Sequence, residues 1–518
     1  MATLLHTQAF AHLNLYKDSV ALMRVAQLLL ALPEVVNATL QMGNPANKEI
    51  LVEAGLLTAE VKDAGPSDIM VVVQACTRAA CEAAIAESRA QLAGQSPLSG
   101  AVSDAAQTWM APRTVGMGLV ALTGANIVQI SVPGAYAAAE ALKALHRGLN
   151  VFMFSDNVPL DQEVALKREA VRRGLLVMGP DCGTALIGGV PLGFANHVRR
   201  GSIGLVAASG TGLQEVTTQI HRMGGGVSHA IGTGGRDVYA QVGGATMLQG
   251  IELLARDGAT RVIVIVSKPP APAVQAKVMQ ALHEGGKPAV VLFLGSAAST
   301  TAALDRNTVV VHTLVDCAAA ALRLAGVRSA APPHDALPRR PAFAASQKYL
   351  RALYSGGTYA AEAQVIWAQA GLEVWSNAPL HPALALKHPK KASRGHTALD
   401  LGDDEFTVGR PHPMIDPAAR IERLLAEAAD PAVRVIVLDV VIGWGAHPDP
   451  ASELAAAVVQ AKRLALKSRR QLAVIGFVCG TELDPQVLAR QEAKLRGAGM
   501  VLAGNSANAA WLAGSWMN

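Results

Sequence analysis

An apolar run that ends in a glycine-rich turn and continues as a helix is the feature that most restricts the fold of this chain. Residues 201–223 read GSIGLVAASGTGLQEVTTQIHRM. The first half has the pattern of a buried strand, the turn is Ser209-Gly210-Thr211-Gly212, and the second half has the spacing of an amphipathic helix. The start of such a helix presents unpaired N–H groups and the positive end of its dipole, which favour a bound anion. The segment predicts a βα unit with a phosphate or acyl-phosphate seat; an ordinary turn that binds nothing is the alternative.

A second glycine-rich loop follows about twenty residues downstream. It reads Ile231-Gly232-Thr233-Gly234-Gly235-Arg236-Asp237 and again lies between an apolar segment and a helical one, Ala245–Arg256. Glycines let backbone approach a ligand closely, and a guanidinium can hold an oxyanion through two parallel hydrogen bonds. We therefore expect Gly234, Gly235 and Arg236 to close on the same anion as the first turn.

Strands and helices alternate over much of the chain, which predicts an α/β protein with several doubly wound parallel sheets. Expected strands are Ile127–Ser131, Val151–Phe154, Leu175–Met178, Arg261–Pro270 and Lys287–Gly295, and expected helices between them include Ala135–Arg147 and Leu160–Arg173. Residues 1–110 have a different pattern and predict a small α+β domain. The further divisions are 112–199, 200–328 and, after a Pro-, Ala- and Arg-rich linker at 327–341, 342–518.

The last of these divisions partly repeats the one before it. Arg434–Asp439, RVIVLD, echoes Arg261–Val266, RVIVIV, and Gln471–Gly480 echoes Lys287–Gly295. Two segments with matching strands predict two domains of the same fold.

Three turns in this order resemble those of the succinyl-CoA synthetase α subunit, and the chain is identified as a member of the FdrA family, proteins described as acyl-CoA synthetases. Gly179-Pro180-Asp181-Cys182-Gly183 is similar to that family's GPN-x-PG turn, Ala208–Thr211 to its SRSGT turn, and Ile231–Asp237 to its GIGGDP loop. The resemblance implies a Rossmann-like CoA-binding-type domain at 112–199 and two flavodoxin-like CoA-ligase-type domains. It also implies that Ser209, Gly210 and Thr211 cradle a phosphoryl or acyl-phosphate group.

The sequence departs from the pattern of the synthetase α subunit in two places. The synthetases carry a phosphohistidine in a GHAGA motif, whereas the corresponding strand here runs into GSAASTTAALDRN, which has no histidine. Where the synthetases begin with a CoA loop of the GFTGxxG kind, this chain has only Thr114–Gly118, TVGMG. Neither a GxxxxGK[ST] loop nor an ATP-grasp segment is recognisable. A nucleotide site is therefore expected on another polypeptide, or the reaction uses inorganic phosphate alone.

These features lead to one main functional hypothesis and two alternatives. FdrA-like proteins are associated with oxamate carbamoyltransferase of allantoin catabolism, so the resemblance implies a transferase subunit that moves a carbamoyl or acyl group between a small carboxylate or amide and phosphate. Phosphate is then a co-substrate, and no other cofactor is predicted. The first alternative is an NDP-forming acyl-CoA synthetase that uses ATP and CoA, and the second is a non-catalytic scaffold subunit.

Further candidate site residues lie at the ends of predicted strands. Asn157 and the pair Asp181 and Cys182 follow strands of the 112–199 segment, where open parallel sheets collect ligands, so they are candidates for substrate or CoA contact. In the last segment, Arg410 is expected to pair with a carboxylate or phosphate, and His412 and His447 to act in acid–base or nucleophilic chemistry. Solvated or locally hydrogen-bonded side chains are the alternative. The carboxylates of 397–417 follow no recognised metal-binding pattern, so no metal is predicted.

Composition limits the remaining possibilities. Hydrophobic residues make up 51% of the 518 residues and charged ones 16%, which excludes a disordered chain. The five cysteines are odd in number and scattered, as expected for reduced thiols in the cytoplasm. A net charge of +5 without basic runs gives no support for nucleic-acid binding. The apolar stretches alternate with loops, so no membrane span is expected. We expect a small-molecule substrate, other subunits of the same enzyme as partners, and association of the Ala-rich surfaces into a homo-oligomer.

Overall fold

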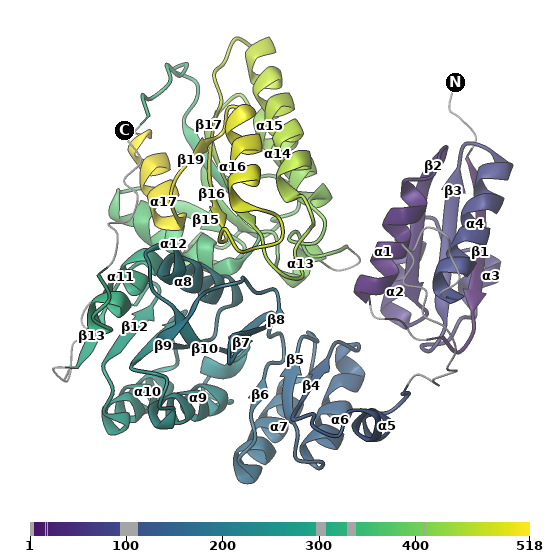
Figure 1. Cartoon of the computed structure of the whole chain (residues 1–518). Coiled ribbons are helices and arrows are strands. Elements are labelled where there is room, and N and C mark those ends of the chain that lie inside the picture. Colours follow the sequence, from purple (N-terminus) through teal and green to yellow (C-terminus); the bar gives the residue numbers. More distant parts are fainter. Residues whose placement is uncertain are drawn as a thin grey trace. The chain divides into compact units, whose positions relative to one another are not determined.

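The computed structural model describes residues 5–15, 17, 19–93, 112–296, 307–328, 338–407 and 410–517. The chain divides into two compact units, Met1–Arg113 and Thr114–Asn518 (Figure 1). Most of the predicted linker, at 329–337, and most of the segment without histidine, at 297–306, lie outside the described residues.

The first unit is built on a three-stranded antiparallel sheet of order β1-β3-β2. Its central strand β3 is buried on both sides, so its sequence, IMVVVQA, does not alternate and is apolar at every position except Gln74. Helices α1 and α4 cover one side and α2 and α3 the other. The elements are β1 (His6–His12), α1 (Ser19–Leu30), β2 (Val35–Met42), α2 (Pro45–Glu53), α3 (Ala59–Lys62), β3 (Ile69–Ala75) and α4 (Arg78–Ala93). The predicted α+β domain is confirmed.

The second unit begins with a small parallel sheet of order β4-β5-β6. Small and apolar residues of its helices fill one core with the strands, as the alternating pattern predicts. The elements are α5 (Val115–Ala121), β4 (Ile127–Ile130), α6 (Gly134–Leu145), β5 (Asn150–Met153), α7 (Leu160–Arg173) and β6 (Val177–Met178).

A seven-stranded sheet of order β13-β12-β11-β9-β10-β7-β8 follows. Strands β13 to β10 are parallel, and the β7–β8 hairpin extends the sheet antiparallel to β10. Because the hairpin pairs here, this sheet begins before residue 200. The elements are β7 (Thr184–Ile187), β8 (Val190–Gly193), β9 (Arg200–Ala207), α8 (Gly210–Arg222), β10 (Val227–Gly232), η1 (Gly235–Val238), α9 (Ala245–Arg256), β11 (Val262–Ser267), α10 (Pro272–Gly285), β12 (Ala289–Phe293), β13 (Thr308–Val310) and α11 (Leu314–Leu324).

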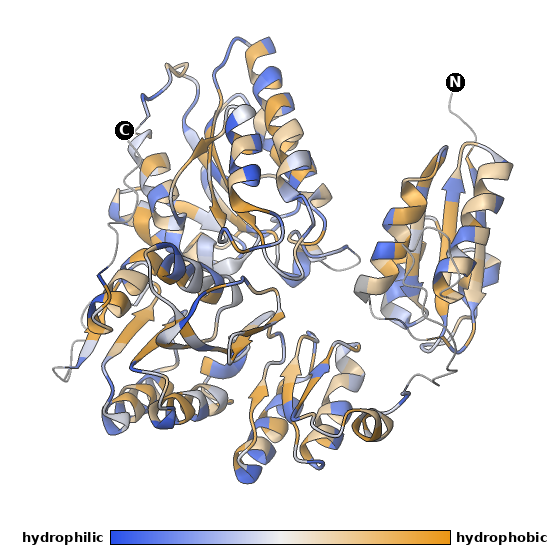
Figure 2. Ribbon diagram, viewed as in Figure 1, coloured by the Kyte–Doolittle hydropathy of each residue, from blue (hydrophilic) through white to orange (hydrophobic). Residues whose placement is uncertain are grey.

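The last sheet is wholly parallel, with six strands in the order β15-β16-β14-β17-β18-β19. Figure 2 shows its strands and those of the preceding sheet as strongly hydrophobic, as expected for strands buried on both faces. The elements are β14 (Tyr349–Tyr354), α12 (Gly357–Gln369), β15 (Val374–Ser376), η3 (Pro382–Leu384), β16 (His396–Asp400), α13 (Asp404–Thr407), α14 (Ala418–Ala429), β17 (Val433–Val441), α15 (Pro450–Lys467), β18 (Ala473–Cys479), α16 (Leu488–Gly497), β19 (Val501–Leu502) and α17 (Ser506–Ser515).

The internal repeat seen in the sequence is also a repeat of topology. Neighbouring strands follow the order β12-β11-β9 in one sheet and β18-β17-β14 in the other. Helix α8 comes directly after β9, and helix α12 comes directly after β14. One apolar core joins the two domains, because α8 and α11 pack against α12 and α17 between the sheets. The predicted fold class is confirmed.

Helix α8 differs from its sequence-based expectation. Its pattern predicts one polar face toward solvent, yet every residue from Thr211 to His221 is buried. The second ligase-like domain covers the polar face and supplies hydrogen-bond acceptors to it. For example, the carbonyl of Gly504 accepts a hydrogen bond from the side-chain amide of Gln219 at 3.2 Å. Polar side chains in α8 therefore join two domains.

Candidate functional site

Helix α8 begins at the end of β9 with a side-chain cap. The backbone of Ser209 is extended, and its Oγ accepts a hydrogen bond from the N–H of Gly212 at 3.0 Å. The hydroxyl thereby satisfies one of the unpaired amides that a helix start exposes. The predicted strand–turn–helix unit is present as described by the sequence pattern.

A second helix start meets the first. Helix α12 follows β14 through Ser355 and Gly356, and the hydroxyls of Thr358 and Ser209 share a hydrogen bond. A Cβ added to Gly356 would lie 2.3 Å from Cγ2 of Thr211, so only glycine allows this approach. We call the space at the two N-termini, bounded by Ser209–Gly212 and Gly356–Thr358, the inter-helix site.

One cation and one carboxyl flank this site. A Cβ added to Gly357 would lie 3.2 Å from Nζ of Lys268 and 2.6 Å from Oδ2 of Asp400. Lys268 follows β11 and is exposed, and among the described residues it forms no ion pair. Asp400 ends β16 and is 8% exposed. Burial raises the pKa of Asp400 to about 7, while Lys268 opposes the shift and Asp403 adds to it.

A buried charge pair forms hydrogen bonds with Ser355. Its N–H donates to Oδ1 of Asp439 at 2.9 Å, and its hydroxyl donates to the other carboxylate oxygen. Arg420 lies 3.3 Å from the same Asp439 oxygen. This network fixes the turn that starts α12.

The second glycine-rich loop is anchored inside the protein. Asp237 accepts hydrogen bonds from the N–H groups of Thr246 and Met247 at the start of α9, and it pairs with buried Lys167 at 2.8 Å. A Cβ on Gly234 would lie 2.2 Å from the carbonyl oxygen of Pro180, whereas Gly235 has open space around it. The loop therefore packs on the Gly179–Gly183 turn.

Arg236 uses its guanidinium within the same region. Its Nε lies 2.9 Å from a carboxylate oxygen of Glu163, and its NH2 donates to the carbonyl of Val158 at 2.7 Å. The charge of Arg236 also lowers the pKa of Asp181 and of Asp404 against the effect of their surroundings. These contacts place Arg236 beside carboxylates, and an anion-clamping role for it stays a prediction.

The candidates that follow β5 and β6 have unlike surroundings. Asn157 is exposed in a left-handed backbone conformation, with φ of 52°. Solvent reaches Asp181, yet enclosure by protein and the nearby Asp156 and Asp404 raise the pKa of Asp181 to about 7. Cys182 is buried, and burial raises the pKa of its thiol to about 12. Asp181 is therefore open to a ligand, whereas Cys182 is enclosed.

The three candidates of the last domain are not brought together. Arg410 is exposed and pairs with Glu422 at 2.8 Å. His412 lies beside the inter-helix site, because a Cβ on Gly402 would be 2.6 Å from its Nε2 and 3.3 Å from Oδ1 of Asp400. Burial lowers the pKa of His412 to about 4.

His447 lies in the loop that leads into α15. Its Nδ1 accepts the N–H of Asp449 at 3.0 Å, and its Nε2 lies 3.5 Å from a carboxylate oxygen of Glu453. The backbone N–H of His447 donates to the carbonyl of Met414 at 2.8 Å. These contacts are local, and a catalytic role for His447 stays a prediction.

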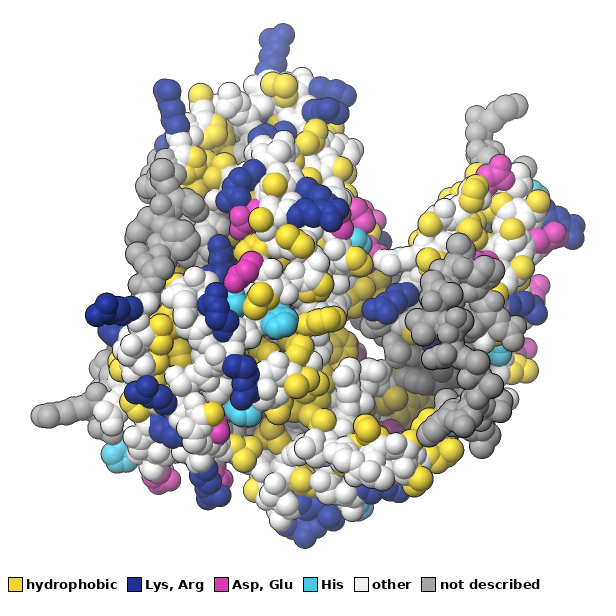
Figure 3. Space-filling view, viewed as in Figure 1, with side chains coloured by type: hydrophobic (Ala, Val, Ile, Leu, Met, Phe, Trp, Pro, Cys, Tyr) yellow, Lys and Arg dark blue, Asp and Glu magenta, His cyan; other side chains and the backbone are white. Residues whose placement is uncertain are grey.

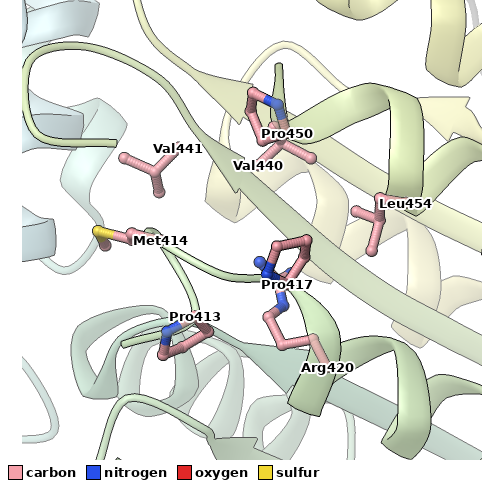
Figure 4. Close-up of a pocket in the computed structure, with 8 residues that line it drawn as sticks. All are labelled: Pro413, Met414, Pro417, Arg420, Val440, Val441, Pro450 and Leu454. Carbon is pink, nitrogen blue, oxygen red and sulfur yellow. The ribbon is translucent and has the colours of Figure 1, made fainter. Parts of the chain in front are cut away.

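A separate small pocket lies behind β17 (Figure 4). It has room for about one water molecule, and apart from Arg420 its lining is apolar: Pro413, Met414, Pro417, Val440, Val441, Pro450 and Leu454. Arg420 is already engaged by Asp439. This pocket contains no residue of the inter-helix site.

Sequence reasoning missed half of the inter-helix site. The turn Ser355-Gly356-Gly357-Thr358 lies between an apolar strand and a helix, the same signal that identified Ser209–Gly212. In the repeat that relates β17 to β11, β14 takes the place of β9, the strand that leads into Ser209. Lys268 carried no such signal, since it is a single charged residue at a strand end. Asp400 was one of several carboxylates in 397–417, and no local pattern distinguished it from the others.

Parallel α/β domains whose Ser- and Thr-containing helix starts meet at one site define a protein of the CoA-ligase type. Comparisons agree, since residues 353–516 match the CoA-ligase family and 198–295 the CoA binding domain. The uncharacterized protein YahF of Escherichia coli (strain K12) is 41% identical over 506 residues, 96% of each chain. This chain belongs to that family, an FdrA-type group of succinyl-CoA-synthetase-like proteins.

More distant relatives cover part of the chain. The α subunit of the ADP-forming succinate–CoA ligase of Aquifex aeolicus (strain VF5) is 31% identical over 28% of this chain and 48% of that subunit. Subunit SauD of the ADP-forming sulfoacetate–CoA ligase of Bilophila wadsworthia (strain 3_1_6) is 26% identical over 28% and 50%. A solved dinucleotide-forming acetyl-coenzyme A synthetase of Ca. Korarchaeum cryptofilum aligns over 76% of this chain and 82% of that chain, with 15% identity and a TM-score of 0.32. The two ligase subunits associate the chain with CoA ligases.

The first unit matches a different family. Residues 5–108 match the heavy metal-associated domain of AllF. Within the parts of the chain that the structure describes, no group of three or more His, Cys, Asp or Glu is arranged to hold a metal ion. The thiol of Cys81 in this unit is buried and donates to the carbonyl of His6 at 2.9 Å.

The distribution of basic side chains on the surface agrees with the lack of basic runs in the sequence. On the face shown in Figure 3, lysine and arginine side chains are scattered among apolar ones and form no continuous basic patch. Among the described residues, no helix has the length and apolar character needed to cross a membrane.

Proposed function

We propose that this chain is the acyl-phosphate-handling subunit of an acyl-CoA ligase. The observation that carries the proposal is the meeting of two helix N-termini, α8 and α12, beside Lys268. An acyl phosphate or phosphate held there faces the positive ends of both dipoles and one ammonium group.

The energetics favour an anion at this position. One helix N-terminus stabilises a nearby negative charge by about 0.3–1 kcal/mol at an exposed site and by up to ~2 kcal/mol where it is partly buried. Here two N-termini act on the same space, and Thr211 and Thr358 are almost fully buried. The charge that builds on the transferring group is thus stabilised by dipoles that need no rearrangement.

The proposed ligase also needs a partner polypeptide that binds the nucleotide. The ADP-forming ligases that the chain resembles carry separate subunits, and no nucleotide-binding loop is recognisable in the sequence. We propose that ATP is handled by another polypeptide, while this chain binds the acyl phosphate and CoA. The small substrate is then a carboxylate that the partner and this chain share.

The test uses a reaction that needs no nucleotide. The purified full chain is mixed with an acyl phosphate, such as acetyl or succinyl phosphate, and CoA, and thioester formation is followed. Phosphate binding is measured in parallel by calorimetry. Thioester formation together with phosphate binding supports the proposal, and the failure of phosphate to bind removes it.

Carbamoyl transfer to phosphate is the second candidate, and one observation favours it. Residues 295–307 contain no histidine, so phosphate itself, and not a phosphohistidine, would meet the acyl group. The corresponding assay supplies oxalurate and phosphate and follows carbamoyl phosphate. Product in this assay alone favours carbamoyl transfer over ligase chemistry, and phosphate binding without either product favours a scaffold subunit.

A further inference from the structure

Asp400 is a carboxyl that lines the inter-helix site directly. Its Oδ1 accepts a hydrogen bond from the N–H of Gly402 at 3.0 Å. The side-chain amide of Asn377 accepts a hydrogen bond from the backbone N–H of Asp400 and donates one to its carbonyl, both at 2.9 Å. Its Oδ2 has no hydrogen-bond partner among the described residues and faces Gly357 at the start of α12. A side chain more than nine-tenths buried with one free oxygen in a site is poised to exchange a proton there.

The surroundings allow this carboxyl to exist in both protonation states near neutral pH. Burial raises its pKa to about 7, and the ammonium of Lys268 opposes the rise. A carboxyl with a pKa near the working pH is the most efficient acid–base group. The charged and titratable groups that face it from neighbouring elements are Lys268, Asp403, Asp439, Asp181 and His412.

We propose that Asp400 carries the proton that passes between phosphate and the group that replaces it on the acyl carbon. This inference rests on the proposed function of the inter-helix site. It assigns Asp400 as the catalytic acid–base and Lys268 as the cation that holds the phosphate oxygens beside it.

The proton balance closes for thioester formation. The thiol of CoA gives its proton to the Asp400 carboxylate as the sulfur–carbon bond forms. The bond between the acyl carbon and the phosphate oxygen breaks, and its electron pair leaves with phosphate. Asp400 then returns the proton to that phosphate, which departs as the monohydrogen anion.

The same balance closes for transfer from an amide nitrogen to phosphate. Monohydrogen phosphate forms a bond to the carbamoyl carbon and gives its proton to the site. The carbon–nitrogen bond breaks, and the leaving nitrogen takes the proton of protonated Asp400. The proton released by phosphate then protonates the Asp400 carboxylate again. No further reactant is needed in either direction.

The test compares Asp400→Asn and Asp400→Glu with the wild type and with Glu252→Gln, a control at an exposed carboxyl of α9 that pairs with Arg256. Binding is probed with sulfate, which does not titrate in this pH range. We expect the sulfate affinity of the wild type to fall as pH rises through 7. The affinity of Asp400→Asn should fall less, because Asp181 still titrates there, and it should be about tenfold higher than that of the wild type at pH 8, because a like charge is gone. Glu252→Gln keeps the wild-type pH dependence.

Turnover in the nucleotide-free assays gives the second readout. Loss of an acid–base group costs about 10²–10⁴-fold in rate, so Asp400→Asn is expected to bind sulfate and to lose turnover by that factor, with partial recovery in Asp400→Glu. Wild-type turnover in Asp400→Asn, or a sulfate affinity that ignores pH in the wild type, overturns the role of Asp400 and leaves the anion site standing. If sulfate and phosphate do not bind the wild type at all, the proposed function itself fails.

Discussion

Glu362 of α12 accepts a hydrogen bond from the N–H of Leu314, the first residue of α11, at 2.7 Å. The relationship is reciprocated, because Glu215 of α8 accepts the N–H of Ser506, the first residue of α17, at 3.3 Å. Each glutamate therefore caps a helix of the other ligase-like domain. Both lie four residues after the threonine of their helix start, so this exchange of caps helps to hold the two N-termini against each other.

The first prediction concerns how stability depends on pH. Burial raises the pKa of Glu362 to about 7, so the folded protein keeps this proton while the unfolded chain loses it near pH 4.5. Stability must then fall as pH rises from about 4.5 to about 7. In Glu362→Gln that loss is absent, and the difference in unfolding free energy between pH 5 and pH 8 is expected to shrink by about 3 kcal/mol.

Urea unfolding at the two pH values measures this difference. Gln keeps an oxygen that accepts the N–H of Leu314, so the cap survives the substitution. Glu453→Gln, on the exposed face of α15, is the control and should leave the pH dependence unchanged. An unaltered pH dependence in Glu362→Gln would show that the carboxyl is already ionised in the folded protein.

The second prediction separates the cap of α8 from its role in anion binding. Ser209→Ala removes the acceptor for Gly212 and the bridge to Thr358, and we expect a loss of about 0.5–2 kcal/mol in stability together with weaker phosphate binding. Thr313→Ala is the matched control, because Thr313 caps α11 in the same way, with Oγ1 accepting the N–H of Asp316 at 3.2 Å. Thr313→Ala should lose similar stability and bind phosphate with the wild-type affinity. Equal phosphate affinity in Ser209→Ala and Thr313→Ala would show that the α8 cap is purely structural.

The third prediction tests the space beside Gly357. Its backbone tolerates an alanine, but the added Cβ would lie 2.6 Å from Asp400 and 3.2 Å from Lys268. Gly357→Ala is expected to fold and to bind phosphate at least about tenfold more weakly. In Gly497→Ala, a helical glycine with open space around it, phosphate affinity should be unchanged. Calorimetric titration decides, and normal affinity in Gly357→Ala would place the anion elsewhere.

Most of the fold followed from the sequence because its strands are long apolar runs. Helix α9 was predicted with its observed ends, and β11 and β12 lie within the runs that predicted them. The strand β1 was missed, since His6–His12 is polar at several positions and owes its place to pairing with β3. The four-domain division stays a prediction.

The site was harder to predict, because it depends on contacts between residues distant in sequence. Ser209 was found from its local turn, whereas its partner Thr358 lies 149 residues away and nothing local connects the two. The polar face of α8 was expected to meet solvent because a single helix does not reveal that another domain covers it. Asp400 became a candidate only when burial and Lys268 were seen together.

The fourth prediction concerns thiol reactivity. Only thiolates react with alkylating agents, and burial raises the pKa of Cys182 to about 12. Cys76 is the exposed thiol among the five cysteines, and the buried ones are Cys81, Cys182, Cys317 and Cys479. Brief treatment of the native protein with iodoacetamide at pH 8 should therefore modify Cys76 alone, as seen by peptide mass spectrometry. Rapid labelling of Cys182 would show that its turn opens, and would return it to the candidates for ligand contact.

The fifth prediction tests whether the second glycine-rich loop is held by a buried charge. Lys167 is 1% exposed and lies 3.0 Å from Glu163 and 2.8 Å from Asp237, the residue that caps α9. Lys167→Met leaves Asp237 buried without its cation, whereas Glu163 keeps Arg236. The loss is expected to cost about 3–5 kcal/mol of unfolding free energy. Lys143→Met removes an exposed lysine paired with Glu140 and should cost less than about 1 kcal/mol. If both variants unfold at the same urea concentration, protonation of the carboxylates relieves the loss of Lys167, and the loop does not depend on that lysine.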